Sequence, residues 1–225
     1  MLYFVIMLPF ILIAMYAQIK VKTTFNRYSK VRSSRGVTGA QAANELLSRN
    51  GLSGIRVEPI KGSLSDHYDP TSGVVRLSET VYGSTSIAAL GVAAHEVGHA
   101  VQHKEKYGPL ELRHTIVPVT NFASSASYFI IIIGMIMQSA NFLLAGIILF
   151  SAVVLFHLVT LPVELNASRR AVAQLSNAGL IASDEAPMVK KVLGAAAMTY
   201  LAAVLSSLAT LFYYIMIFAG GSSDD

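Results

Sequence analysis

Apolar residues along the chain are gathered into three long stretches without charged side chains, at residues 1–19, 115–163 and 192–223. A helix needs about 20 apolar residues to cross the hydrocarbon core of a bilayer, so the middle stretch is long enough for two crossings. A short polar segment at residues 138–141 divides it. The pattern therefore predicts four transmembrane helices, at residues 1–19, 115–138, 141–161 and 192–220.

The segment between the first two stretches, residues 20–114, has the pattern of a small folded domain. Thr38 and Gln41 have the spacing of a capping box and precede an alanine-rich run, which predicts a helix. Gly51 is a natural end for that helix, since glycine is favoured just past a helix C-terminus. A second helix is predicted from about Ser86 to His103, after a run of residues that favour helix N-caps.

Between these helices the pattern changes to short runs that favour strands. Residues 55–57 and 74–77 each predict a strand, and the sequence DPTSG at residues 69–73 predicts a turn before the second one. We expect a small antiparallel sheet. The predicted fold class is therefore a mainly α membrane protein, with four transmembrane helices and a small α+β cytoplasmic domain that carries the second helix.

The composition agrees with a membrane protein and limits the chemistry. The chain is 53% hydrophobic and only 13% charged, whereas soluble domains carry about 25% charged residues. It contains no cysteine, which excludes disulfides, thiolate metal ligands and a cysteine nucleophile. Any metal ion must therefore be held by histidine, carboxylate or backbone oxygen.

The basic residues predict how the chain is oriented in the cell membrane. All 17 Lys and Arg lie in two segments, residues 20–114 and 162–191. Cytoplasmic loops of membrane proteins are enriched in Lys and Arg, so we expect both segments in the cytoplasm. The two termini, including an acidic tail at residues 221–225, are then outside. Lys20 and Lys22 follow the first apolar stretch, which favours a permanent anchor over a cleaved signal peptide.

The net charge of +4 indicates attraction to the lipid bilayer rather than to nucleic acid. Aromatic and basic residues are not interleaved in the way that nucleic-acid-binding surfaces require. No pattern in the sequence indicates an oligomeric state.

The sequence HEVGH at residues 95–99 is the clearest candidate for chemistry. His95 and His99 are four residues apart on a predicted helix, so both imidazoles project from one face and can bind one zinc ion. Glu96 lies beside that face, where it suits a general base acting on water. Small residues around the motif, including Ala94 and Gly98, would let another element approach closely. The alternative is a helix with two polar-face histidines and no metal.

A zinc site of this kind needs a third protein ligand. Besides several carboxylates, the candidates are His67, His103, His114 and His157. Glu164 is favoured, because it follows Pro162 at the cytoplasmic end of the third predicted span, where a carboxylate is otherwise costly. The alternative for Glu164 is a solvated position at a helix end. We expect a surface or supporting position for His103 and a structural role for His157.

Two segments resemble a known family. Residues 66–103, DHYDPTSGVVRLSETVYGSTSIAALGVAAHEVGHAVQH, closely resemble the YugP-type neutral zinc metallopeptidases, and residues 162–171, PVELNASRRA, match a second motif of that family. These are multi-pass membrane proteins, similar in plan to the HtpX-like peptidases and other gluzincins, and the resemblance covers nearly the whole chain.

The resemblance implies a zincin-like cytoplasmic segment at residues 20–114, with zinc bound by His95, His99 and Glu164 and with Glu96 as the catalytic residue. Many gluzincins carry an aspartate four residues after the ligand glutamate. This chain has Ser168 there, which can accept an imidazole N–H but brings no charge.

The expected activity is hydrolysis of peptide bonds at the cytoplasmic membrane surface, on polypeptide substrates associated with the membrane. The strand at residues 74–77 is expected to bind an extended substrate by edge pairing. Candidates for stabilising the oxyanion are Arg169, Arg170, His67 and Tyr200. Two alternatives remain open, namely a membrane scaffold or sensor with a structural zinc site, and a hydrolase that acts on a non-peptide amide or ester.

Overall fold

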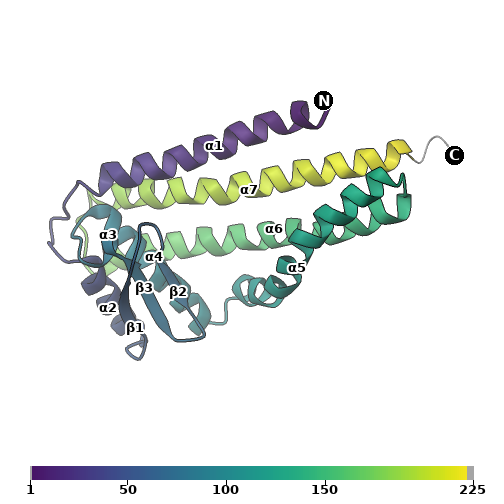
Figure 1. Cartoon of the computed structure of the whole chain (residues 1–225). Helices are drawn as coiled ribbons and strands as arrows, with labels where there is room; N and C mark the ends of the chain where they lie inside the picture. The colour runs from purple at the N-terminus through teal and green to yellow at the C-terminus, as the bar shows by residue number, and fades with distance from the viewer. Residues whose placement is uncertain (1, 222–225) are drawn as a thin grey trace. The chain divides into compact units, whose positions relative to one another are not determined.

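The computed structural model describes residues 2–221 as a mainly helical chain with one small sheet (Figure 1). The helices and strands, in chain order, are α1 Leu2–Tyr28, α2 Gly39–Arg49, β1 Arg56–Ile60, β2 His67–Asp69, β3 Val74–Ser78, α3 Glu79–Tyr82, α4 Ile87–Lys104, α5 Gly108–Ile136, α6 Ala140–Asn177 and α7 Ala186–Gly221. The predicted acidic tail falls outside the described residues, apart from the backbone of Gly221.

Four helices, α1, α5, α6 and α7, are long and apolar enough to cross a membrane, which confirms the number predicted from the sequence. They extend well beyond the predicted spans, because α1 continues to Tyr28 and α6 continues to Asn177. The loss of apolar character therefore does not end either helix, since main-chain hydrogen bonds continue through polar residues. Where each helix enters and leaves the bilayer remains a prediction.

The chain forms two compact units, which are described separately. The first contains the described residues up to Ala17, Gly108–Pro162 and the described residues from Thr199 onward. Its buried apolar cluster is small and consists of Ile131, Leu143, Ile147 and Tyr214. Large apolar side chains on its surface are exposed, such as Phe122 at 68% and Ile136 at 78%. An apolar surface of this kind is typical of helices that face lipid.

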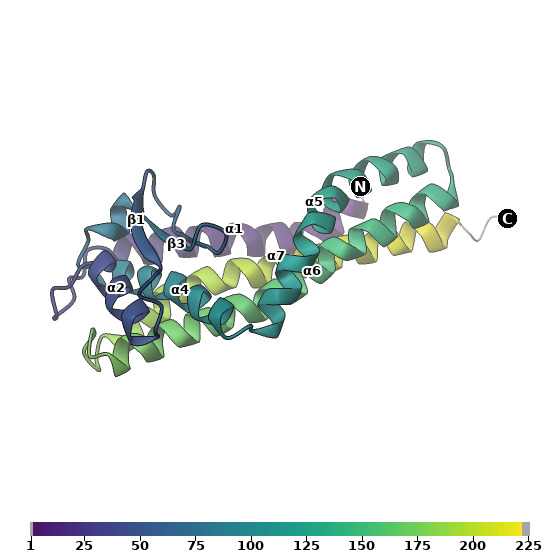
Figure 2. The same cartoon turned by 90° about the horizontal axis from the view of Figure 1, so that it is seen from below.

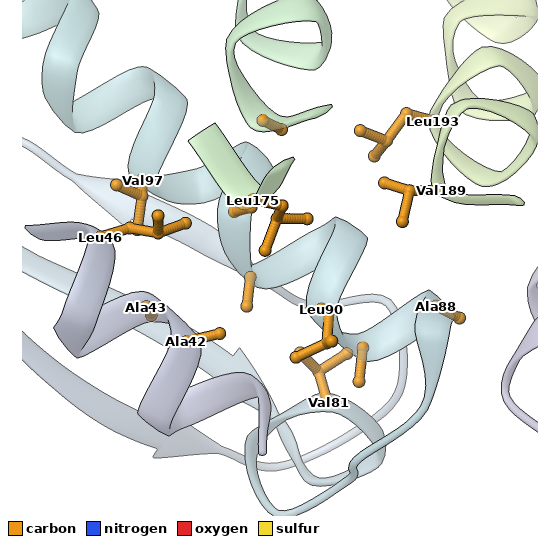
Figure 3. Close-up of a cluster of buried hydrophobic side chains, with 14 of the residues drawn as sticks. Ala42, Ala43, Leu46, Val81, Ala88, Leu90, Val97, Leu175, Val189 and Leu193 are labelled. Carbon is orange, nitrogen blue, oxygen red and sulfur yellow. The ribbon is translucent and has the colours of Figure 1, made fainter. Parts of the chain in front are cut away.

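The second unit contains Gln18–Tyr107 and Val163–Met198. It holds the larger buried apolar cluster, to which α2, α4, α6 and α7 all contribute side chains (Figure 3). Leu46, Leu90, Val97 and Leu175 are at most 1% exposed. The helix α2 lies alongside α4 and the strand β1 in both views (Figures 1 and 2).

The sequence patterns at the helix ends are confirmed. The Thr38 side chain accepts from the Gln41 amide and the Gln41 side chain accepts from the Thr38 amide, so the capping box is present. Gly51 follows α2 with φ 64°, a conformation that favours glycine. Ser86 caps α4 and accepts from the amide of Ala89 at 3.2 Å.

The prediction of an antiparallel sheet is only partly right. The sheet has three strands in the order β1-β3-β2, with β2 antiparallel and β1 parallel to β3. The predicted turn folds β2 back on β3 as a hairpin, and β1 pairs along the other side of β3. The three-residue strand His67–Asp69 was not predicted, because it is short and mostly polar. The helix α3 was also not predicted.

This strand order corrects the expected role of residues 74–77. Because β3 lies between β1 and β2, both of its edges are paired and it cannot accept an extended substrate by edge pairing. The edges of the sheet are β1 and β2, and β2 is the edge strand that contacts α4. Any edge pairing next to α4 must therefore use β2.

A buried carboxylate joins two loops of the second unit. Glu185 accepts hydrogen bonds from the backbone N–H of Ser34 at 2.7 Å and of Ala182 at 2.8 Å. Burial raises the pKa of Glu185, but these hydrogen bonds lower it by more, so its pKa lies below the usual value. The α1–α2 connection is thus tied to the α6–α7 connection, which helps to position the start of α7.

Candidate metal centre

The helix α4 presents His95 and His99 side by side. Their ring centroids are 4.8 Å apart and the rings are nearly perpendicular, with an interplanar angle of 84°. A spacing of four residues places both side chains over the same stretch of helix surface, as the sequence predicted.

Gly98 allows the helix α6 to approach this part of α4. A Cβ atom added at Gly98 would lie 2.9 Å from the backbone oxygen of Ala167, closer than real Cβ contacts allow. This confirms that small residues in the motif admit a neighbouring element. The close approach brings Glu164, which is only 3% exposed, to the histidine face of α4.

Three potential ligand atoms converge where the two helices meet. The Nε2 atoms of His95 and His99 lie 3.2 and 3.6 Å from Oε2 of Glu164, and the three ligand atoms all lie within 4.8 Å of one another. Tetrahedral zinc with bonds of about 2.0–2.2 Å separates its ligand atoms by about 3.4 Å. Both distances to Glu164 are close to that separation, so the residues fit a zinc ion.

The neighbours of His99 determine which of its nitrogens can bind a metal. Gln102 is fully buried, and its Nε2 donates to the backbone oxygen of Val163 at 2.9 Å. A carbonyl oxygen can only accept, so this contact fixes the orientation of the Gln102 amide. Its Oε1 then faces Nδ1 of His99 at 3.0 Å, and Nδ1 must be the donor. The Nε2 atom of neutral His99 therefore offers its lone pair toward Glu164.

Ser168 takes the corresponding position next to His95. Its Oγ lies 3.2 Å from Nδ1 of His95 and can accept the N–H, as the sequence predicted. Because a hydroxyl carries no charge, it raises the basicity of the imidazole less than a carboxylate would. The Nε2 of His95 is thereby also left facing Glu164.

The electrostatic environment of the cluster favours a cation. Burial lowers the pKa of His99, but the hydrogen bond to Glu164 and the charge of Glu96 raise it by more, so the pKa of His99 is above its usual value. Two carboxylates thus act on one imidazole. Glu96 is 8% exposed, lies next to His95 in α4 and is not one of the three converging residues.

The other candidate residues are not among the converging ligands. Arg170 donates to Asn166 Oδ1 at 2.7 Å and pairs with Glu105 at 2.7 Å. Arg169 is exposed and donates to the backbone oxygen of Leu165. His67 contacts the backbone oxygen of Ser65 through Nδ1 at 2.8 Å. Within the described residues, none of these three side chains is hydrogen-bonded or ion-paired to the ligand atoms. Their role at an oxyanion remains a prediction, as does that of Tyr200.

The remaining histidines are not part of the converging group either. His103 contacts the hydroxyl of Tyr68 on β2 through Nδ1 at 3.0 Å, in agreement with a supporting position. The ring of His157 lies 5.7 Å from that of Phe156 in α6. Neither side chain belongs to the group that could hold a metal ion.

Two residues that support the cluster were missed in the sequence. Gln102 holds His99, and Asn166 in turn accepts from Gln102 at 2.9 Å. The spacing of three residues from His99 to Gln102 places both on one helix face, so this signal was present. Asn166 could be found only once α6 was placed against α4.

Comparisons with known proteins show a family and a relative that the chain resembles. A family model described as "Putative neutral zinc metallopeptidase" matches residues 3–219. The chain is 53% identical over 213 residues to the "Putative membrane protease YugP" of Bacillus subtilis (strain 168), and the match covers 95% of each chain. No solved structure matches the chain.

Proposed function

The chain belongs to this neutral zinc metallopeptidase family, and on that premise we propose that it is a membrane-embedded endopeptidase that uses zinc to hydrolyse peptide bonds. The convergence of His95, His99 and Glu164 carries the proposal. Three protein ligands leave one position of a tetrahedral ion for water or substrate, which is the arrangement of catalytic zinc sites.

We assign His95, His99 and Glu164 to binding the ion and Glu96 to acid–base chemistry. When bound, zinc would act as a Lewis acid on the substrate carbonyl and make water more acidic. Glu96 removes a proton from the attacking water as the new C–O bond forms, and returns it to the amine nitrogen as the C–N bond breaks. Gln102 keeps His99 in one tautomer throughout, and the Ser168 hydroxyl is placed to accept the Nδ1 proton of His95.

The proposed substrate-binding edge is β2. It is an edge strand of the sheet and contacts α4, which carries the two histidines. An extended peptide that pairs with β2 gains main-chain hydrogen bonds that do not depend on its sequence. Such binding suits an endopeptidase that accepts varied polypeptides.

We further propose that residues 20–114 and 162–191 are cytoplasmic and that residues 20–114 form a zincin-like domain. The distribution of Lys and Arg supports this orientation. Because the chain lacks cysteine, a single cysteine introduced at Lys61 gives an unambiguous label. It should resist an impermeant thiol reagent in intact cells and react after permeabilisation. Reaction in intact cells would reverse the orientation.

Membrane-associated polypeptides are the proposed substrates. In the sequence, Glu164 follows the charge-free stretch that ends at Val163, so a ligand of the proposed site lies directly after an apolar span. Loops and tails of other membrane proteins remain close to such a position, whereas soluble chains do not.

A non-proteolytic scaffold with structural zinc is the second candidate. Structural zinc sites are closed by four protein ligands and have no use for a general base. Within the described residues, the metal-binding group contains three His or carboxylate side chains and no fourth. Together with Glu96 beside His95, this favours the enzyme.

Replacing Glu96 with Gln separates the two candidates. The amide keeps the size of the side chain but removes the base, so zinc content and fold should be unchanged while cleavage falls about 10²- to 10⁴-fold. The assay uses one cleavable sequence fused at several distances from a transmembrane anchor. Unchanged cleavage by Glu96→Gln would rule out the proposed catalytic role, and equal cleavage at every distance would rule out the preference for membrane-associated substrates.

A further inference from the structure

The second unit has a groove of about 530 Å³ between α6 and α7, within the size range of small-molecule sites. Most of its lining is apolar and comes from Leu165, Val172, Leu193 and Ala197. Gly194 keeps one wall open, because a Cβ atom added there would meet no other atom within 4 Å. The groove can therefore hold an apolar group.

Two cations, Arg169 on α6 and Lys190 on α7, also line the groove, together with the small side chains of Ser168 and Ala173. Within the described part of the chain, neither has a carboxylate at ion-pair distance, and Arg169 donates only to the backbone oxygen of Leu165. The adjacent Arg170 differs, because it pairs with Glu105 at 2.7 Å. The positive charge at the groove is thus not neutralised by the protein and favours an anionic ligand.

The position of these cations in the sequence indicates where that ligand comes from. Arg169 follows the charge-free stretch that ends at Val163, and Lys190 precedes the one that begins at Val192. Basic pockets between helices at the margin of membrane spans are typical sites for anionic lipid headgroups. Apolar walls and unneutralised cations together match a molecule with an acyl chain and a phosphate.

We propose that this groove binds one anionic glycerophospholipid. Its phosphate lies between Arg169 and Lys190, and an acyl chain lies against Leu165, Val172 and Leu193. A free phosphate would satisfy the cations but leave the apolar walls in contact with water, so the lipid is the better match. The inference does not depend on the proposed peptidase activity.

The test uses full-length protein purified in detergent and titrated with a fluorescent phosphatidylglycerol, with phosphatidylcholine as the zwitterionic reference. Each basic residue contributes about a fivefold gain in affinity for an anionic lipid, whereas the choline cation of phosphatidylcholine offsets the charge of its phosphate. Wild type should therefore prefer phosphatidylglycerol by about 25-fold, and the double variant Arg169→Gln/Lys190→Gln should lose that preference. Zinc content and thermal unfolding report separately on the fold, because neither residue contacts the proposed metal ligands.

Two further variants separate a built site from general surface charge. Arg35→Gln/Lys61→Gln removes the same charge from exposed positions outside the groove and should keep the preference. Gly194→Leu keeps both cations and fills the groove, so it should weaken binding of either lipid. A leucine also suits an exposed helical position better than glycine does, so the fold should persist.

Several results would overturn the proposal. These are equal affinity for the two lipids, an equal loss in the Arg35→Gln/Lys61→Gln control, unchanged binding by Gly194→Leu, and displacement of the lipid by inorganic phosphate alone. Displacement by a short acidic peptide, with no dependence on an acyl chain, would instead assign the groove to a polypeptide.

Discussion

The two sides of α6 in the second unit are packed in opposite ways. On the side of α4, Gly98 is so close to Ala167 that no side chain fits between the helices. On the side of α7, Gly194 borders a groove of about 530 Å³ and has open space around its Cα. One helix thus contributes to a closely packed ligand cluster and to an open apolar groove.

The difference shows what each kind of packing makes possible. Metal ligands from two helices must lie a few ångströms apart, which requires that the backbones approach closely and keep a fixed distance. A groove for a ligand requires the reverse, because the helices must lie further apart and their side chains must leave the space between them empty. A change of one methyl group should therefore have opposite effects on the two sides.

Replacing glycine with alanine on each side of α6 should have the largest effects. Gly98→Ala should destabilise the second unit by about 1–3 kcal/mol, because the new methyl group overlaps the backbone of α6. It should also reduce zinc binding by moving Glu164 away from the histidines. Thermal unfolding and zinc content of the purified protein measure both effects.

Gly194→Ala is the matched control. At an exposed helical position with open space, alanine should stabilise by about 0.5–1 kcal/mol. Equal effects of the two substitutions, or full zinc content in Gly98→Ala, would show that the close approach of α4 and α6 does not determine the cluster.

A smaller effect is expected from the residue that holds His99. Gln102→Leu removes the acceptor of the Nδ1 proton, so zinc affinity should fall about 10- to 100-fold. Competition with a zinc chelator measures this change. Gln174→Leu is the matched control, since the buried Oε1 of Gln174 has no hydrogen-bond partner within the described residues. Its replacement should leave zinc affinity unchanged, and a similar loss in both variants would contradict the role of Gln102.

Local features of the fold could be predicted well from the sequence. The capping box at Thr38, the helix that begins after Ser86 and the number of apolar spans depend on neighbouring residues or on composition, and all three are confirmed. The parallel pairing of β1 with β3 could not be predicted, because it depends on where β1 packs beside the hairpin of β2 and β3. The central position of β3 then corrected the expected substrate edge.

The candidate site shows the same division between local and long-range information. The spacing of His95 and His99 can be recognised within one helix. Glu164 lies 69 residues after His95 in the sequence, and the fold brings it next to the two histidines. Gln102 lies on the same helix but acts by bridging to Val163 and Asn166 on α6. Its role becomes visible only with both helices in place, although its spacing from His99 was a signal.

The zinc content of Glu164→Ala is the decisive measurement for the proposed ligand set. Wild type and Glu96→Gln should each bind about one zinc ion per chain, because the ligand set is intact in both. Glu164→Ala should bind far less, since only two imidazoles remain. If Glu164→Ala retains one full equivalent of zinc while remaining folded, then Glu164 is not the third ligand and the proposed zinc site is wrong.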